Sequence, residues 1–305
     1  MPNTAKIIGL GAYLPKKVLS NKDLEKIVDT TDDWIVSRTG MKERRIADSE
    51  EYTSDMGIAA ASKALNDAGL EPQEIDLIVV ATLTPDYTFP STACIIQNAL
   101  GCINAASVDV QAACSGYVYA LSMAKAYIDS GMYKNILIVA SEKLSSIVNY
   151  HDRNTCILFG DGAASCIVSS SKTGYSIKHI SLGSDGEQSK LLILPAGGSK
   201  KPATSETVLN NEHYIQMEGR EVFKHAVRRM ESAVRKCLVA SNLTESDISW
   251  MVPHQANIRI IDAIAKRFNV PKDHVYLTIQ KYGNTSASSI GIALEELVRE
   301  KEIKN

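Results

Sequence analysis

Cys114 is the side chain in this sequence best placed to act as a nucleophile. It follows a strand-like segment, 106–111, and precedes a stretch with helical periodicity, 117–127. Unpaired backbone N–H groups and the dipole at the start of a helix favour a thiolate. The neighbours Ala112, Ala113, Ser115 and Gly116 are small, so they leave room for a substrate and leave N–H groups free to face an oxyanion. A buried structural thiol fits this local sequence equally well.

Two further polar side chains follow strand-like segments. His254 lies in Val252-Pro-His-Gln-Ala-Asn257, and Asn284 lies in the small polar turn Gly283-Asn-Thr-Ser. Catalytic groups gather at the carboxyl ends of strands in α/β proteins. Taken singly, the histidine is more typical of a structural or exposed residue, and the Gly-Asn pair of an ordinary turn. Neither is convincing alone, but together with Cys114 they would form one site, provided that the three side chains meet.

An internal repeat indicates how they could meet. Residues 56–82 read as an alanine-rich helix that ends at Gly69, a loop and a strand, and residues 222–254 repeat this plan. Each unit then continues with a helix (91–100 and 256–268) and another strand (106–111 and 274–279). Leu65, Leu70, Ile75, Leu77 and Val79 match Leu238, Leu243, Ile248, Trp250 and Val252 at one offset. Chance similarity of generic helix–loop–strand units is the alternative to duplication.

The repeat predicts an α/β fold of two duplicated halves, residues 1–172 with the cysteine and residues 173–305 with the histidine and asparagine. Alternating strands and helices favour mostly parallel sheets with covered faces. Pseudo-twofold halves would bring the ends of their strands together, and with them Cys114, His254 and Asn284.

Composition excludes several classes of function. The chain has 305 residues, of which 45% are hydrophobic and 22% charged, and a net charge of −2. This balance predicts no whole-chain attraction to nucleic acid or to an anionic membrane. Six cysteines without a Cys-x-x-Cys pair predict neither a disulfide scaffold nor a metal site. No charged-then-apolar leader precedes the first strand-like residues, so we expect a cytoplasmic protein.

The motifs together resemble the β-ketoacyl-acyl carrier protein synthase III family of the thiolase superfamily. The resemblance rests on three motifs that look catalytic, Ala-Ala-Cys114-Ser-Gly, Pro-His254-Gln-Ala-Asn257 and Gly283-Asn284-Thr-Ser-Ala. It covers residues 5–304 in order. Further matches are Trp34-Ile-Val-Ser-Arg38-Thr-Gly40, Phe89-Pro-Ser, Phe159-Gly-Asp-Gly162-Ala-Ala and Glu221-Val-Phe223-Lys224.

The resemblance implies an acyltransferase with a thiolase-like fold layered α-β-α-β-α. Its expected reaction is the decarboxylative condensation of an acyl-CoA primer with malonyl-acyl carrier protein through an acyl-cysteine, which initiates type II fatty acid synthesis. His254 and Asn284 would stabilise the enolate. The bulk of Phe89 and Phe159 at matched positions favours acetyl-CoA as the primer. The family also implies a homodimer and no cofactor, since the CoA thioester is itself a substrate.

The resemblance also assigns binding residues. Trp34 and Arg153 would flank the adenine of CoA, Arg38 would approach its phosphates, and Gly219 and Asn257 would line the pantetheine arm. Leu83, Phe89, Leu144 and Phe159 match acyl-pocket positions, with Phe89 reaching into the partner subunit. Lys224, Arg259, Lys266 and Arg267 would form a basic patch for the acidic carrier protein. Core packing and ordinary solvated charge are the alternatives for these residues.

The sequence departs from the family at its end. Family members continue beyond Asn305 with a final strand pair and a glycine-rich turn that supplies a second oxyanion donor, so this strand pair is expected to be missing here. Two other enzyme functions remain open, a thiolase and a ketosynthase of secondary metabolism, although no second catalytic cysteine follows Cys237. A non-catalytic CoA-binding relative is the alternative from another class.

Overall fold

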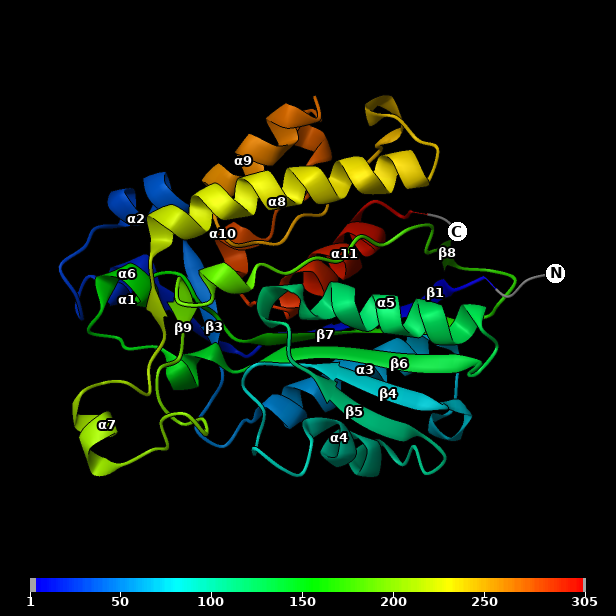
Figure 1. Cartoon of the computed structure of the whole chain (residues 1–305), viewed down its shortest axis with the longest axis horizontal. Helices are drawn as coiled ribbons and strands as arrows, with labels where there is room; N and C mark the ends of the chain where they lie inside the picture. The colour runs from blue at the N-terminus through cyan, green and yellow to red at the C-terminus, as the bar shows by residue number, and fades with distance from the viewer. Residues whose placement is uncertain (1–3, 304–305) are drawn as a thin grey trace.

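The computed structural model describes residues 4–303. The expectation about a leader concerns the chain start and lies outside these residues. A six-stranded sheet in the order β5-β4-β6-β7-β1-β8 forms its centre (Figure 1). Strands β1, β4, β5 and β6 run in one direction, and β7 and β8 run antiparallel to them. The strands are β1 Lys6–Tyr13, β4 Leu77–Ala81, β5 Ala106–Val110, β6 Asn135–Glu142, β7 Gly162–Ser169 and β8 Tyr175–Ser176.

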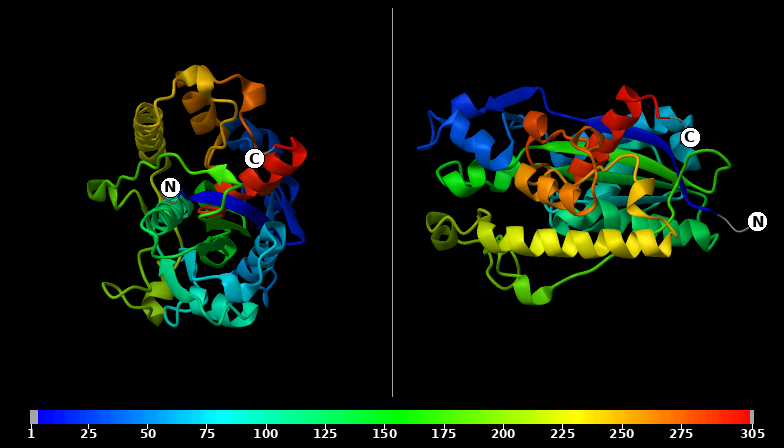
Figure 2. Two further views of the ribbon diagram at one scale, coloured as in Figure 1. Left: turned by 90° about the vertical axis from the view of Figure 1, so that its right-hand side faces the viewer. Right: turned by 90° about the horizontal axis from the view of Figure 1, so that it is seen from above.

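Helices cover both faces of this sheet. Every residue of β4, β6 and β7 is buried, as expected for near-continuous apolar strands in the middle of a covered sheet. Helices α3 (Thr53–Ala68) and α4 (Thr92–Leu100) pack on one face, and α5 (Gly116–Asp129) and α11 (Ser288–Glu300) pack on the other (Figures 1 and 2). Because α11 comes from the end of the chain, it ties the second half to the sheet of the first.

Glycines in β1 allow α3 to lie directly on the strand. A Cβ at Gly11 would lie 2.2 Å from the carbonyl oxygen of Ala60, and one at Gly9 would lie 2.4 Å from that of Ala64. The predicted helix stop is confirmed, since Gly69 adopts a left-handed φ of 63° at the end of α3. The alanine-rich pattern therefore reflects close contact between a helix and a strand.

The second half is mainly helical among the described residues. Its long helix α8 (Gly219–Ala240) packs against α9 (Ile258–Arg267), and α10 (Ile279–Tyr282) leads to α11. The strands predicted at 248–254 and 274–279 are wrong as continuous strands, because only Met251 and Val275 form an isolated parallel bridge. Within residues 4–303 no further strand flanks this bridge, and a lone pair of extended segments is marginal without neighbours.

Side-chain hydrogen bonds hold these two segments together where the ladder stops. The buried Gln255 donates to the carbonyl oxygens of Pro253 and Tyr276 and accepts from the N–H groups of Thr278 and Ile279. One amide thus fixes the segment that carries the predicted catalytic histidine against the segment that leads to Asn284.

The layers follow the predicted order. From α3 and α4 the molecule continues through the sheet, through α5 and α11, through the Met251–Val275 bridge, to α8 and α9 (Figures 1 and 2). No helix among residues 4–303 is both long and apolar enough to cross a membrane. The smaller elements are β2 Lys17–Ser20, β3 Glu43–Ile46, β9 Leu192–Ile193, β10 Gln216–Met217, α1 Asn21–Leu24, α2 Asp32–Thr39, α6 Arg153–Cys156 and α7 Ser205–Leu209.

Candidate active site

The candidate nucleophile lies in a strained turn between β5 and α5. Cys114 is the central residue of a single 3-10 turn, Ala113–Ser115, immediately before the first residue of α5. Ala113 has a φ of 45°, in the left-handed region that a residue with a Cβ occupies at a cost of about 1–3 kcal/mol. Such strain is concentrated at functional sites, and the half-buried Cys114 is the next residue in the chain.

Burial keeps Cys114 protonated in the resting enzyme. Desolvation raises the pKa of the thiol to about 11, and the charge of Glu142 raises it further, while the Ser286 hydroxyl and the cysteine's own N–H lower it. The start of α5 therefore does not by itself produce a stable thiolate. Another group has to accept the proton when the sulfur attacks.

Asn284 is fixed by a contact between the two halves of the chain. It forms an isolated parallel bridge with Phe159, in which the Asn284 N–H donates to the Leu158 carbonyl (2.9 Å) and the Gly160 N–H donates to the Asn284 carbonyl (3.0 Å). The approach needs glycine: Gly283 has a φ of 65°, and a Cβ there would lie 2.8 Å from the Leu158 oxygen. The Asn284 Oδ1 accepts from the Ser286 N–H at 2.8 Å, so the remaining function of this amide is as a donor.

His254 is neutral and oriented by Ser289. Burial lowers the pKa of the imidazole to about 4, so the ring carries no charge near neutral pH. Its Nδ1 lies 2.6 Å from the Ser289 hydroxyl, which also accepts from the Gln255 N–H at 3.4 Å. Because that hydroxyl then has its own proton to give to Nδ1, the network assigns the imidazole proton to Nε2, as a second donor.

One segment, residues 284–289, brings the three predicted side chains together. The Ser286 hydroxyl lies close enough to the Cys114 thiol to lower its pKa, and Ala287 would contact a Cβ at Gly116 at 3.3 Å. Ser289, three residues further on, holds His254. The start of α11 thus lies against the start of α5 and against the end of the 251–254 segment. Residues 284–289 thus link the three side chains, and their action as one catalytic site stays a prediction.

The residues expected at the adenine of CoA lie together but leave no gap. The guanidinium carbons of Arg38 and Arg153 each lie 4.9 Å from the centroid of the Trp34 ring. Arg153 also donates to the Asp29 carbonyl at 2.9 Å. A base stacked between Trp34 and Arg153 would therefore have to displace the arginine from the ring.

The residues expected along the pantetheine arm lie on either side of this cluster. Asn257 caps α9 through the Arg259 N–H and donates to the Arg38 carbonyl at 3.1 Å, which joins α9 to α2. Gly219 is the exposed first residue of α8.

Three of the four residues expected to line an acyl pocket pack in one cluster. Leu144 and Phe159 are buried in a core cluster that includes residues of α9, and the partly buried Leu83 packs against this cluster. Phe89 is different, since 84% of it is exposed. Its reach into a partner subunit stays a prediction.

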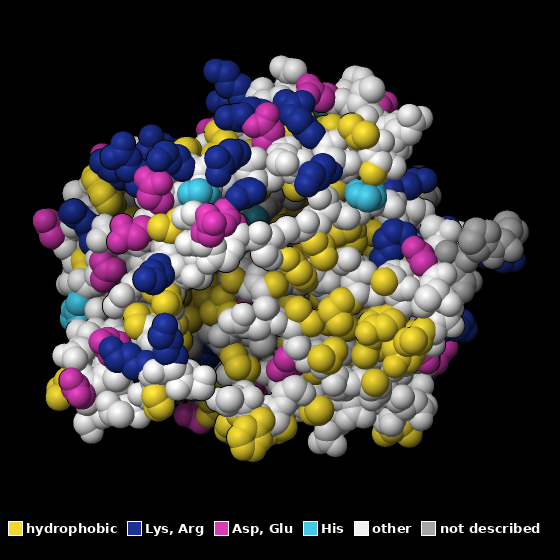
Figure 3. All heavy atoms as spheres, in the orientation of Figure 1, with side chains coloured by type: hydrophobic (Ala, Val, Ile, Leu, Met, Phe, Trp, Pro, Cys, Tyr) yellow, Lys and Arg dark blue, Asp and Glu magenta, His cyan; other side chains and the backbone are white. Residues whose placement is uncertain are grey.

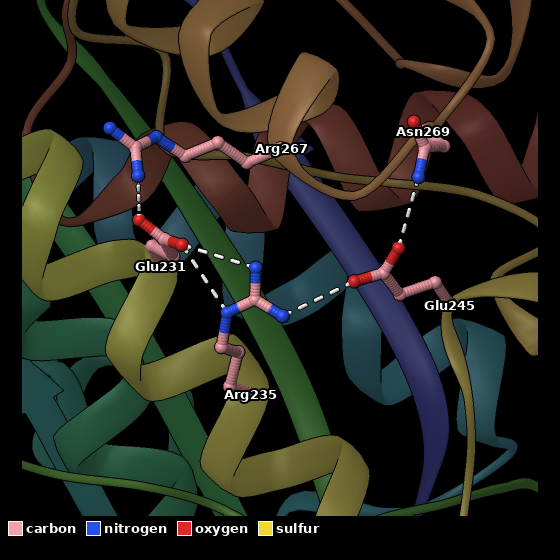
Figure 4. A network of polar contacts seen from close by, with 5 residues as sticks. All are labelled: Glu231, Arg235, Glu245, Arg267 and Asn269. Atoms are coloured by element: carbon pink, nitrogen blue, oxygen red, sulfur yellow. Dashed lines mark hydrogen bonds and ion pairs between the residues drawn. The ribbon is translucent and has the colours of Figure 1, made fainter.

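Two of the four residues of the expected basic patch form ion pairs within residues 4–303, and two do not. Lys224 pairs with Glu221 at 3.1 Å, and Arg267 pairs with Glu231, which also binds Arg235 (Figure 4). Within the described chain, no ion pair involves the exposed Arg259 or Lys266. Lys and Arg side chains gather over α8 and α9, and hydrophobic side chains gather over α5 (Figure 3).

Three residues near Cys114 and His254 were missed from the sequence, namely Glu142, Ser286 and Ser289. Ser286 and Ser289 belong to the small polar stretch after Asn284, whose composition predicted only a turn. Glu142 ends a buried strand, where a carboxyl group is unusual, and this was the one signal that could have found it.

The structure is similar to solved condensing enzymes. The crystal structure of 3-oxoacyl-[acyl-carrier-protein] synthase III from Aquifex aeolicus VF5 superposes with a TM-score of 0.90 at 48% identity, over 98% of this chain and 92% of that one. The priming β-ketosynthase of the R1128 polyketide pathway superposes with a TM-score of 0.90 at 36% identity, over 99% and 90%. The fold and its cysteine site thus define a thiolase-like, acyl-transferring condensing enzyme.

Sequence comparison narrows the class. The models of 3-oxoacyl-[acyl-carrier-protein (ACP)] synthase III and of its C-terminal part match residues 108–186 and 238–305. The β-ketoacyl-[acyl-carrier-protein] synthase III of Chlamydia trachomatis serovar D is 57% identical over 98% of this chain and 92% of its own length. The chain belongs to the β-ketoacyl-acyl carrier protein synthase III family, the condensing enzymes of fatty acid synthesis.

Proposed function

We propose that this enzyme transfers an acetyl group from acetyl-CoA to Cys114 and condenses it with malonyl-acyl carrier protein. The observation that carries the proposal is the pairing of a neutral His254 with the Asn284 amide beside one thiol. Two neutral donors suit an enolate, whose charge develops only during the reaction. A protonated imidazole would instead attract the malonyl carboxylate before it is lost.

In the loading step, the Cys114 sulfur attacks the thioester carbonyl and CoA departs. Exchange between two thioesters is nearly level in energy, so this step depends on forming the thiolate and holding the oxyanion. The strained turn at Ala113 holds the sulfur at the start of α5, where the helix dipole favours negative charge.

In the condensing step, malonyl-acyl carrier protein loses carbon dioxide and its enolate attacks the acyl-cysteine. The His254 Nε2 proton and the Asn284 Nδ2 protons would stabilise the enolate oxygen. Loss of carbon dioxide leaves the carbanion directly, so no strong base is needed at the malonyl carbon. Two hydrogen-bond donors at the enolate oxygen fit this chemistry.

The first test is acylation of the purified protein by acetyl-CoA. Intact-mass measurement should show the addition of one acetyl group, and peptide mapping should place it on Cys114. The matched control is Cys114→Ala, which retains the other five cysteines. Acetylation of the Cys114→Ala variant, or condensation at the wild-type rate, would remove Cys114 as the acyl carrier.

Support for a short primer comes from the residues around the thiol. Leu144 and Phe159 are 1% and 6% exposed and fill the region next to the Asn284 bridge with bulky side chains. Steady-state rates with acetyl-CoA and with longer acyl-CoA primers test this proposal. A preference for the longer primers would contradict it.

The proposed homodimer would cover the free edge of the sheet. Strand β5 lies at the edge with exposed Ala106 and Val108, and a flat apolar edge invites pairing with a second chain. The exposed Phe89 precedes α4, which packs beside β5. A second subunit on this edge would bury that ring and bring it near the partner's acyl pocket.

A second candidate is the priming step of a polyketide pathway, because the structurally similar R1128 protein is a priming β-ketosynthase. The same chemistry at Cys114 would serve both, so the carrier protein distinguishes them. Condensation rates with the fatty acid carrier protein and with a polyketide carrier protein, measured side by side, decide between the two.

A further inference from the structure

A buried carboxyl group faces the active site from the sheet. Glu142 is the last residue of β6 and has no exposed surface. Its Oε2 accepts from the Leu83 N–H at 3.0 Å and from the hydroxyls of Thr82 and Thr84 at 3.2 and 2.9 Å. Three donors on one oxygen hold the carboxyl group in a single orientation. The position of its other oxygen, Oε1, is therefore fixed as well.

The second carboxylate oxygen of Glu142 has no hydrogen-bond partner, and neither does the hydroxyl of Ser286. Glu142 Oε1 and Ser286 Oγ are both buried atoms without a hydrogen bond. The Ser286 hydroxyl nevertheless lies close enough to lower the pKa values of both the Glu142 carboxyl and the Cys114 thiol. Unpaired buried polar atoms are rare in proteins because each costs about 1–3 kcal/mol. A rotation of one hydroxyl would complete a chain from the carboxyl group to the sulfur.

The backbone holds this hydroxyl in place at a further cost. Ser286 has a φ of 50°, in the left-handed region. Its N–H is bound to the Asn284 Oδ1, and the next residue, Ala287, packs against the start of α5. The strained residues Ala113 and Ser286 therefore flank the thiol from opposite halves of the chain.

We propose that Cys114 and Glu142 share one proton through the hydroxyl of Ser286, with Glu142 as the proton acceptor that generates the nucleophilic thiolate. The proposal rests on Cys114 being the acyl carrier. It assigns a proton-transfer role to Glu142 and a relay role to Ser286. Neither residue was among the site residues predicted from the sequence.

The proton balance of the reaction is consistent with this role. In loading, the sulfur–carbon bond to the acyl group forms and the carbon–sulfur bond of acyl-CoA breaks. The thiol proton passes to Ser286 Oγ while the Ser286 proton passes to Glu142, and CoA leaves as a thiolate that takes a proton from water. In condensation, the carbon–carbon bond forms, Cys114 leaves as a thiolate, and Glu142 returns the proton through Ser286. The cycle ends with the thiol and the carboxylate restored.

The electrostatics of the site leave Glu142 as the suitable base. Burial raises its pKa to about 7, whereas the low pKa of His254, about 4, makes that imidazole a weak base. The groups that face Glu142 are uncharged. The loop after β4 contributes the hydroxyls of Thr82 and Thr84 and the Leu83 N–H, and the segment before α11 contributes the Ser286 hydroxyl. On the neighbouring strand β7, Gly162 pairs with Glu142. Cys114, beyond Ser286, is the titratable group to which it is coupled.

The test is the pH dependence of Cys114 alkylation by iodoacetamide, which needs neither acyl-CoA nor carrier protein. The wild-type rate should rise in two steps, the first near the pKa of Glu142. In Glu142→Gln and in Ser286→Ala the first step should disappear, and the rate at about pH 8 should fall roughly tenfold or more. Asp161→Asn is the matched control, since Asp161 is also buried with three donors but touches Ala47 and Ser145 instead. Its first step should remain.

The direction of the change separates this role from a merely structural or electrostatic one. The charge of Glu142 raises the pKa of the Cys114 thiol, so removing the charge alone would speed alkylation at neutral pH. Faster or unchanged alkylation in Glu142→Gln would overturn the proposal, as would loss of the first step in Asp161→Asn. A single step in the wild-type profile would overturn it without any variant. Acetylation of Cys114 by acetyl-CoA would still stand in each case.

Discussion

Replacing Asn284 by alanine should separate the two half-reactions. The amide is assigned to the enolate, and loss of one preorganised donor costs roughly 2.7–4 kcal/mol in the transition state, or a factor of about 10²–10³. Malonyl decarboxylation should fall by that factor in Asn284→Ala. Acetylation of Cys114 should fall much less, because the thiolate is generated by groups on other residues.

The same substitution should also lower stability, and the structure shows why. The Asn284 Oδ1 is the acceptor of the buried Ser286 N–H at 2.8 Å. Leaving that N–H unpaired costs about 1–3 kcal/mol of the free energy of unfolding. Asn284→Asp is the matched control, because it keeps an acceptor oxygen and loses the donor. It should recover part of the stability lost in Asn284→Ala, because the Ser286 N–H keeps an acceptor, although a buried carboxylate is itself costly. It should decarboxylate as poorly as the alanine variant.

The assay measures three quantities on each variant: carbon dioxide release from malonyl-carrier protein, the single-turnover rate of acetylation by intact mass, and the midpoint of urea unfolding. If acetylation and decarboxylation fall equally in Asn284→Ala, the amide does not act on the enolate alone. If Asn284→Asp decarboxylates at the wild-type rate, the donor assignment is wrong.

Four further predictions follow from the geometry. His254 stays neutral on folding although its unfolded pKa is 6.5, so acid destabilises the native state below that value; stability should fall by about 2 kcal/mol between pH 6.5 and pH 5, and His254→Gln should lose this dependence in urea titrations. Val108→Asp on the β5 edge should dissociate the proposed dimer in sedimentation. Lys63→Glu should not, because Lys63 lies on α3 beside β1, away from the β5 edge. Lys266→Glu should raise the KM for malonyl-carrier protein with little change in acetylation, and equal effects on both would argue against a docking role. Gly283→Ala should lower decarboxylation at least tenfold through the clash with Leu158, and a crystal structure with the Asn284 bridge intact would contradict the reasoning.

The local parts of the site could be predicted from the sequence. A strand, a small-residue turn and a helix in direct succession fix the position of Cys114, since all three form from neighbouring residues. The same holds for the turn at Gly283, where a left-handed residue is needed next to the catalytic amide. Periodicity also located α3, α4 and α9 to within a few residues.

The long-range parts could not be predicted, because their causes lie in distant segments. His254 depends on Ser289, 35 residues away, and nothing in either local sequence pairs them. The apolar segments at 248–254 and 274–279 have strand-like composition, but a strand exists only with partners, and here the ladder ends at Met251 and Val275. The contact of Arg153 with the Trp34 ring likewise joins segments far apart in the sequence, and the place of these residues around an adenine stays a prediction.

The two-residue bridge between Phe159 and Asn284 joins the two halves of the chain at one point. Phe159 belongs to the half that carries Cys114, and Asn284 belongs to the half that carries His254. A change that loosens this bridge would therefore move the Asn284 amide relative to the first half without altering any predicted catalytic side chain. Substitutions around Leu158 and Gly160, whose backbones hold Asn284, are thus expected to act on the site through its geometry.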